Sequence, residues 1–152
     1  MLSFLSKKTE DTVRIGKRLA RALRKGDIVC LSGDLGTGKT TFTQGIAKGL
    51  GIREKFVNSP TFILMNEYDG RLPLFHFDLY RIDNAKEILS IGYEEFLYDN
   101  GVAVVEWAEK LGALIPKNYL KVKFTHKSDN ERFIEFGAVG KRAEEIIAKL
   151  KK

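Results

Sequence analysis

One short segment constrains this chain more than any other. Residues 33–40 read Gly-Asp-Leu-Gly-Thr-Gly-Lys-Thr, which fits the spacing G-x-x-x-x-G-K-[S/T] at every fixed position. Glycines let consecutive backbone N–H groups curl around phosphate oxygens, and a helix that begins at Lys39 points its positive end at the same anion. An apolar run precedes the segment and a helical pattern follows it. The sequence therefore predicts a phosphate-binding loop between a strand and a helix.

Each position in this loop has an expected role. Lys39 should be exposed at the loop, where its ammonium can reach the β- and γ-phosphates, and the Thr40 hydroxyl can bind Mg²⁺. The alternative is a plain glycine-rich turn, but the pattern arises by chance at roughly 4 in 100,000 positions. The predicted cofactor-binding residues in this segment are Asp34, Leu35, Gly36, Thr37, Gly38, Lys39, Thr40 and Thr41.

Carboxylates that could complete such a site follow two apolar runs. Residues 102–105 are Val-Ala-Val-Val, and Glu106 follows them, so a buried strand would deliver this carboxylate to the metal beside Thr40. The second candidate is Asp78, in a run where His76 and Asp78 alternate with apolar neighbours. That polar face belongs either to the site or to a solvent-exposed side of the strand.

Two further positions have competing interpretations. Thr61, in Ser-Pro-Thr-Phe at residues 59–62, lies between the loop's helix and the next strand, where P-loop nucleotidases keep a threonine that senses the γ-phosphate. Serine and threonine are also common turn residues. Trp107 follows Glu106 directly and either borders the site or anchors the core.

The apolar patterns predict an α/β, P-loop NTPase-like fold with a mixed sheet, parallel at its centre with antiparallel hairpins, flanked by helices in one domain over residues 1–152. Residues 1–6 are a short apolar patch before lysines and do not resemble a secretory signal. We expect strands over residues 27–32, 62–68, 72–80, 102–105, 119–126 and 132–138, and helices over 9–25, 39–50, 84–98, a short stretch to about 114, and 140–152.

Composition and charge limit the partners and the cellular compartment that we expect for this protein. The net charge is +6, with ten Lys/Arg against four Asp/Glu in residues 1–50, five against nine in 51–100 and eleven against seven in 101–152. This distribution suits either a phosphate-rich partner or an ordinary solvated surface. A single cysteine excludes an internal disulfide, and no apolar run approaches the ~18 residues that cross a bilayer. We therefore expect a cytoplasmic protein with no membrane association.

Four motifs occur along the chain in an order that resembles that of the TsaE (YjeE) family of bacterial P-loop ATPases. The resemblance runs from about Thr9 to the last strands. The motifs are Gly-Asp-Leu-Gly-Thr-Gly-Lys-Thr-Thr at 33–41, Ser-Pro-Thr-Phe at 59–62, His-Phe-Asp-Leu-Tyr-Arg at 76–81 and Val-Glu-Trp-Ala-Glu at 105–109.

The resemblance implies ATP and Mg²⁺ as cofactors, and a part in making threonylcarbamoyladenosine (t6A) at position 37 of tRNA with the TsaD and TsaB proteins. It implies an ATPase that does not itself transfer the carbamoyl group. Indirect contact with tRNA fits this role, and the sequence leaves direct contact open. It makes Thr61 and Asp78 switch or catalytic-site candidates and Glu106 a metal carboxylate. It also brings residues near Asp11 and Thr12 toward the adenine.

Two other functions remain open at this point. A small-molecule kinase is one, because a compact P-loop domain can phosphorylate a metabolite, although it would need an acceptor pocket and mobile arginines. A nucleotide-gated binding module with negligible hydrolysis is the other. A screen of metabolites for phosphorylated product would separate the kinase from the t6A ATPase. ATP hydrolysis measured with and without TsaD–TsaB, expected to be slow for the protein alone, would separate the binding module from it.

Overall fold

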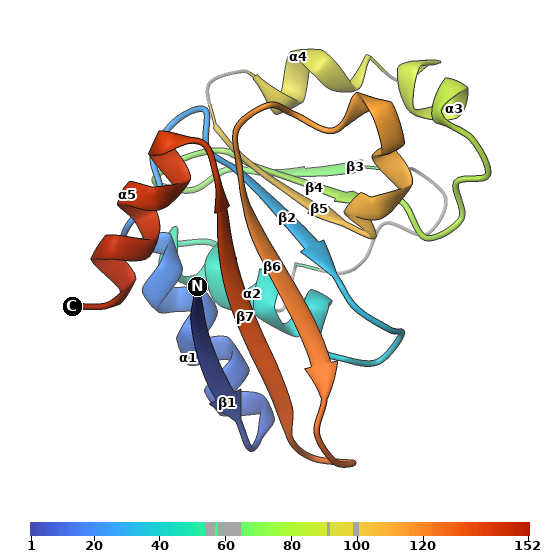
Figure 1. Cartoon of the computed structure of the whole chain (residues 1–152). Helices are drawn as coiled ribbons and strands as arrows, with labels where there is room; N and C mark the ends of the chain where they lie inside the picture. Colours follow the sequence, from blue (N-terminus) through green and yellow to red (C-terminus); the bar gives the residue numbers. More distant parts are fainter. Residues whose placement is uncertain (54–56, 58–64, 91, 99–100) are drawn as a thin grey trace.

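The structure, a computed structural model, describes residues 1–53, 57, 65–90, 92–98 and 101–152. Seven strands form one mixed sheet in the order β1-β7-β6-β2-β5-β4-β3 (Figure 1). Its central strands β6, β2, β5 and β4 are parallel, and antiparallel pairs flank them at both edges, which confirms the predicted fold class. The strands are β1 (Leu2–Ser6), β2 (Ile28–Ser32), β3 (Met65–Tyr68), β4 (Leu74–Asp78), β5 (Val102–Glu106), β6 (Tyr119–His126) and β7 (Arg132–Val139).

Strand β1 is the element that sequence patterns missed. It pairs antiparallel with β7, so that Leu2 faces Phe136 and Ser6 faces Arg132. A run this short has no clear period of its own, and its partner strand lies at the other end of the sequence. Pairing with that distant strand makes it part of the sheet.

The helices agree with the predicted positions except in the middle of the chain. The predicted helix over residues 84–98 is two short helices, because Gly92 adopts a left-handed backbone (φ 67°) between them. Helix α1 also stops earlier than expected and continues as turns toward Gly26. The helices are α1 (Thr9–Ala20), α2 (Lys39–Gly49), α3 (Ala85–Ser90), α4 (Tyr93–Leu97), the 3₁₀ helix η2 (Ala108–Leu114) and α5 (Lys141–Leu150).

Both faces of the central sheet are covered, because its strands are apolar on both sides. Val29, Leu31 and Val104 pack against α1, α2 and α5, whereas Cys30 and Phe77 pack against α3, α4 and η2 (Figure 1). The sheet thus separates two apolar layers, and alternate residues of one strand face different helices.

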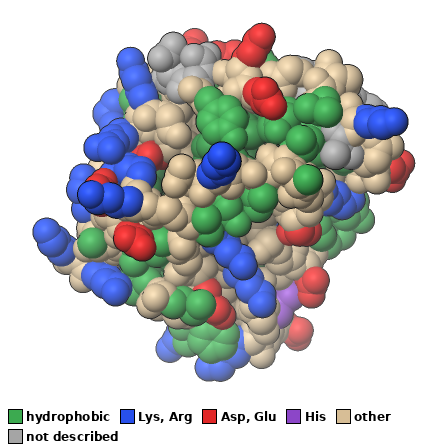
Figure 2. Space-filling model, turned by 45° about the horizontal axis from the view of Figure 1, so that its top comes forward, with side chains coloured by type: hydrophobic (Ala, Val, Ile, Leu, Met, Phe, Trp, Pro, Cys, Tyr) green, Lys and Arg blue, Asp and Glu red, His purple; other side chains and the backbone are tan. Residues whose placement is uncertain are grey.

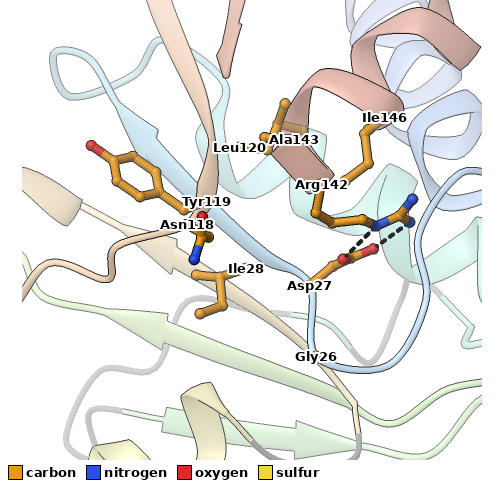
Figure 3. Close-up of a pocket in the computed structure, with 9 residues that line it drawn as sticks. All are labelled: Gly26, Asp27, Ile28, Asn118, Tyr119, Leu120, Arg142, Ala143 and Ile146. Atoms are coloured by element: carbon orange, nitrogen blue, oxygen red, sulfur yellow. Dashed lines mark hydrogen bonds and ion pairs between the residues drawn. The ribbon is translucent and has the colours of Figure 1, made fainter. Parts of the chain in front are cut away.

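A partly buried ion pair connects helix α5 to Asp27, the residue before β2. Arg142 points at Asp27 and donates to both carboxylate oxygens, at 2.9 and 2.8 Å (Figure 3). It also donates to the Ala22 carbonyl, at 2.7 Å. These two side chains help to line a cavity of about 180 Å³ between α5 and the adjacent ends of β2 and β6.

The surface carries its basic side chains unevenly. Figure 2 shows Lys and Arg gathered along one side, the side on which α1 and α5 lie in Figure 1. The ends of these two helices contribute Arg18, Arg21, Lys149 and Lys152 to one shallow hollow. Within the described part of the chain, no helix has the length and apolar character that a bilayer crossing requires.

Candidate functional site

The glycine-rich loop (residues 33–38) connects β2 to α2. Three of its glycines have left-handed backbones, with φ of 143° at Gly33, 79° at Gly36 and 100° at Gly38. Such angles are strained for any other residue. A Cβ on Gly38 would also stand 2.7 Å from Nη1 of Arg132. Glycine at this position therefore serves both the turn and the close approach of an arginine from β7.

Lys39, the first residue of α2, is not exposed as the sequence led us to expect. It is only 4% exposed, and its Nζ donates to the carbonyls of Gly33 (2.6 Å) and Asp34 (2.8 Å). Thr37 Oγ1 lies 3.4 Å from the same nitrogen. The expectation was wrong because the loop curls over its own lysine and supplies it with carbonyl acceptors.

The surroundings of Lys39 combine burial with negative charge. Burial lowers the pKa of its ammonium, and four nearby carboxylates oppose that shift: Glu106, Glu109, Asp78 and Asp34. Its Nζ also lies 4.3 Å from the centre of the Trp107 ring, which packs at 5.0 Å against the ring of Tyr80. Trp107 therefore borders the loop lysine, and among the described residues it is the one non-glycine with a positive φ (59°).

Thr40 and Glu106 meet as the sequence predicted. The Thr40 hydroxyl lies 3.0 and 3.1 Å from the two carboxylate oxygens of Glu106, which ends β5 and is 2% exposed. A hydroxyl and a carboxylate beside the glycine-rich loop fit Mg²⁺, which takes few protein oxygens and keeps several waters. No cluster of three or more His, Cys, Asp or Glu forms a metal cage in the described ranges.

Asp78 and His76 lie on the same face of the sheet as Glu106. Asp78 is the register partner of Glu106 on the neighbouring parallel strand. Its carboxylate accepts a hydrogen bond from the Tyr80 amide, at 3.0 Å. His76 is fully buried, and its Nε2 contacts Oε2 of Glu106. The solvent-exposed alternative for this strand face is therefore wrong: the polar face points at the loop's helix.

The residues expected near the adenine lie at the start of α1, which packs alongside α2. Thr12 is 1% exposed and shares a 2.7 Å hydrogen bond with Ser6. Asp11 accepts from the Lys7 amide (3.0 Å) and from Arg14 (2.7 Å). Both side chains already have protein partners, and their contact with a base stays a prediction.

The remaining predicted residues divide into three groups. Asp34, Leu35 and Gly36 form the exposed tip of the loop, where Leu35 is 69% exposed. Thr41 lies half-buried in the first turn of α2. Thr61 lies outside the described residues.

Sequence reasoning missed Arg132 as a neighbour of the loop. It begins β7, far along the chain, and no motif includes it. Its Nε is buried without a partner among the described residues, while its Nη1 lies beside Gly38. A local pattern could not have found it, because only the pairing of β7 with β6 and β1 carries it to the loop.

A parallel sheet centre, helices on both faces and a glycine-rich turn between β2 and α2 define an α/β protein of the P-loop NTPase-like class. Comparison with known proteins narrows this class. The family described as threonylcarbamoyl adenosine biosynthesis protein TsaE matches residues 6–134. The chain belongs to the TsaE family.

Individual relatives agree with this assignment. The chain is 44% identical to a tRNA threonylcarbamoyladenosine biosynthesis protein TsaE of Bacillus subtilis over 93% of this chain and 88% of that protein. It is 39% identical to the Treponema pallidum protein of the same name, over 86% and 96%. A crystal structure of Bacillus subtilis YdiB superposes with a TM-score of 0.84 at 38% identity, covering 99% of this chain and 93% of that one.

Proposed function

We propose that this protein binds and hydrolyses ATP with Mg²⁺ in support of t6A formation at position 37 of tRNA. The observation that carries the proposal is the contact between the Thr40 hydroxyl and the Glu106 carboxylate at the end of the glycine-rich loop. It joins the beginning of a helix, which attracts anions, to a buried carboxylate. That pairing suits a cation bridging protein and phosphate better than it suits a structural turn.

Each residue then has a defined task in binding. Lys39 exchanges the Gly33 and Asp34 carbonyls for phosphate oxygens, so its charge stays satisfied throughout. Thr40 and Glu106 would hold the Mg²⁺, which when bound would supply positive charge against the phosphates. Glu106 and Asp78, side by side on β5 and β4, are the candidates for positioning the attacking water.

The biological role rests on the family. The relatives are named for tRNA threonylcarbamoyladenosine biosynthesis, and we infer the same process for this chain, in the cytoplasm. We propose that it acts with TsaD and TsaB, does not transfer the carbamoyl group and hydrolyses ATP slowly alone. The exposed loop tip, with Leu35, leaves room for a partner to reach the phosphates and accelerate turnover.

A titration of TsaD–TsaB tests this function. Affinity and phosphate release are measured in ATP, in ADP and without nucleotide. We expect affinity to depend on the nucleotide, because a ligand shifts an equilibrium only through its different affinities for the two forms, and we expect faster hydrolysis in the complex. Identical affinities with unstimulated hydrolysis would overturn the coupled-ATPase model, and a phosphorylated metabolite in a substrate screen would replace it with a kinase.

A further inference from the structure

His76 has no role in the function proposed so far, yet it lies at the centre of the site. It occupies the middle of β4, is fully buried and faces the same side of the sheet as Asp78. Its register partner on β5 is apolar Val104, and its ring reaches along the sheet to Glu106. Because a carboxylate can only accept, the nitrogen that contacts it, Nε2, carries the hydrogen.

Two side chains, His76 and Thr40, donate to the carboxylate of Glu106. Oε2 of Glu106 meets both His76 Nε2 and the Thr40 hydroxyl at 3.1 Å, whereas Oε1 meets Thr40 at 3.0 Å. A glutamate has one more rotatable bond than an aspartate and loses more side-chain freedom when it is fixed. A buried donor on the neighbouring strand removes that freedom before any ligand arrives.

A purely structural role would not require this pair. Buried ion pairs and hydrogen-bonded pairs contribute little net stability, because desolvation offsets their attraction, and apolar side chains of similar volume often replace them without loss. The strand that carries His76 has apolar Leu74 one step earlier on the same face. A histidine at this depth, aimed at the carboxylate beside Thr40, is better explained by what it does to that carboxylate.

We propose that His76 is a positioning residue that holds Glu106 in the rotamer needed to bind Mg²⁺, through its Nε2–H. This inference rests on the proposed function, since it assigns a task toward the same cation. Hydrogen-bonding partners of metal ligands orient those ligands, and their loss weakens metal affinity by about 10- to 100-fold.

Three substitutions separate positioning from packing. In His76→Gln the side-chain amide nitrogen can take the place of Nε2, in His76→Asn it takes the place of Nδ1 and falls short of Glu106, and His76→Leu has no donor. The readout is binding of Mn²⁺ by electron paramagnetic resonance at saturating ADP, alongside ADP affinity in EDTA. We expect His76→Leu and His76→Asn to weaken Mn²⁺ binding about 10-fold or more, and His76→Gln to stay within about threefold.

Other results overturn the proposal in distinguishable ways. If Mn²⁺ affinity is the same in all three variants, His76 does not position Glu106. If wild-type ADP affinity does not respond to divalent cations at all, the proposed function fails as well. If His76→Leu does not fold, the comparison of His76→Gln with His76→Asn tests the proposal instead, because both variants keep a buried amide. Equal Mn²⁺ affinity of these two variants would overturn it.

A measurement on the wild-type protein tests the same proposal independently. Long-range ¹H–¹⁵N spectra report the tautomers of its two histidines, His76 and His126. We expect His76 to carry its hydrogen on Nε2, with a proton that exchanges slowly with solvent. A His76 ring with hydrogen on Nδ1 alone would overturn the proposal whatever the variants do.

Discussion

At the scale of residues, Lys39 already has hydrogen-bond partners in the glycine-rich loop before any ligand binds. Its Nζ is held by the carbonyls of Gly33 and Asp34 and covered by the Trp107 ring. Removing the side chain would therefore take away the proposed phosphate ligand and would also leave two loop carbonyls without their donor. Both effects can be measured separately, as affinity and as stability.

We expect Lys39→Ala to raise the dissociation constant for Mg·ATP by about 10- to 100-fold, the worth of a charge-assisted hydrogen bond. It should also lower the free energy of unfolding by about 1–2 kcal/mol, since the loop carbonyls lose a partner. ATP-dependent thermal shifts measure the first effect and denaturant melts the second. Lys48→Ala, at the exposed other end of α2, is the control. Equal ATP-dependent shifts in Lys39→Ala and wild type would contradict the assignment.

Glu106→Gln should keep nucleotide binding and lower hydrolysis about 100-fold or more, because the amide preserves the shape and removes the charge. The Gln side chain can still accept from Thr40 and His76, so the fold should persist. Phosphate release at saturating Mg·ATP is the measurement, with Trp107 fluorescence as the binding signal. Turnover at the wild-type rate would shift the role to Asp78.

Cys30 gives a pH-dependent prediction away from the site. Burial raises the pKa of its thiol from 9.0 to about 12. Between these values the unfolded chain loses the proton first, so stability is fully present below pH 9 and falls as pH rises, by up to about 1.4 kcal/mol per pH unit. In Cys30→Ala this contribution is absent. Denaturant melts from pH 8 to 10.5 should show the stability advantage of wild type shrinking above pH 9, and a constant difference would contradict this.

At the scale of elements, the site depends on how closely α1 lies against α2. A Cβ on Gly45 would stand 2.3 Å from the Val13 carbonyl oxygen, and one on Gly16 would stand 2.4 Å from that of Phe42. These two glycines let the helices touch through their backbones. The contact keeps the start of α1 beside the helix that begins at the loop.

Gly45→Ala should therefore lower the free energy of unfolding by about 1–3 kcal/mol through overpacking. Gly137→Ala on β7 is the matched control, because its nearest neighbour would be the Lys121 Cβ at 3.9 Å, and it should stay within about 0.5 kcal/mol of wild type. Urea melts of both variants make the comparison. Equal stability of the two would show that the α1–α2 contact can relax freely.

Sequence patterns predicted most of the helices and strands and part of the candidate site. Short apolar runs predicted β2 and β5, and the glycine-rich motif between β2 and the next helix predicted α2, and hence the meeting of Thr40 with Glu106. The patterns failed where contacts between distant parts of the chain determine the environment of a residue. The burial of Lys39 depends on loop curvature, and the position of Arg132 depends on strand pairing. Polar alternation at His76 was visible, but which face was buried could be seen only once α2 covered it.

For the whole molecule, the Asp27–Arg142 pair connects the end of the chain to the beginning of the central strand. Hydrogen bonds to Asp27 raise the pKa of Arg142, so its guanidinium stays charged at every ordinary pH. The Asp27 side chain is 4% exposed and that of Arg142 is 19% exposed. Removing Arg142 leaves the Asp27 carboxylate desolvated and without this ion-pair partner, with a hydrogen bond from the Arg24 amide at 2.8 Å.

Arg142→Ala should lower the free energy of unfolding by about 2–4 kcal/mol, slightly less than for a fully buried pair because Arg142 is partly exposed. The exposed neighbour Lys141→Ala should change it by less than about 0.5 kcal/mol. In a double-mutant cycle with Asp27→Ala, the combined loss should be smaller than the sum of the two single losses. Strict additivity would contradict a direct coupling between these side chains.

The pairing of β1 with β7 also has a consequence for how the chain is made. On the ribosome, residues 2–6 emerge well before the strand with which they pair, Arg132–Val139. Until then the edge of β6 is open, and an open edge is a template for pairing with other chains. A nascent chain stalled before residue 132 should therefore associate with chaperones or aggregate, whereas one that has released β7 can close its sheet and carry Arg132 to Gly38 in the same step.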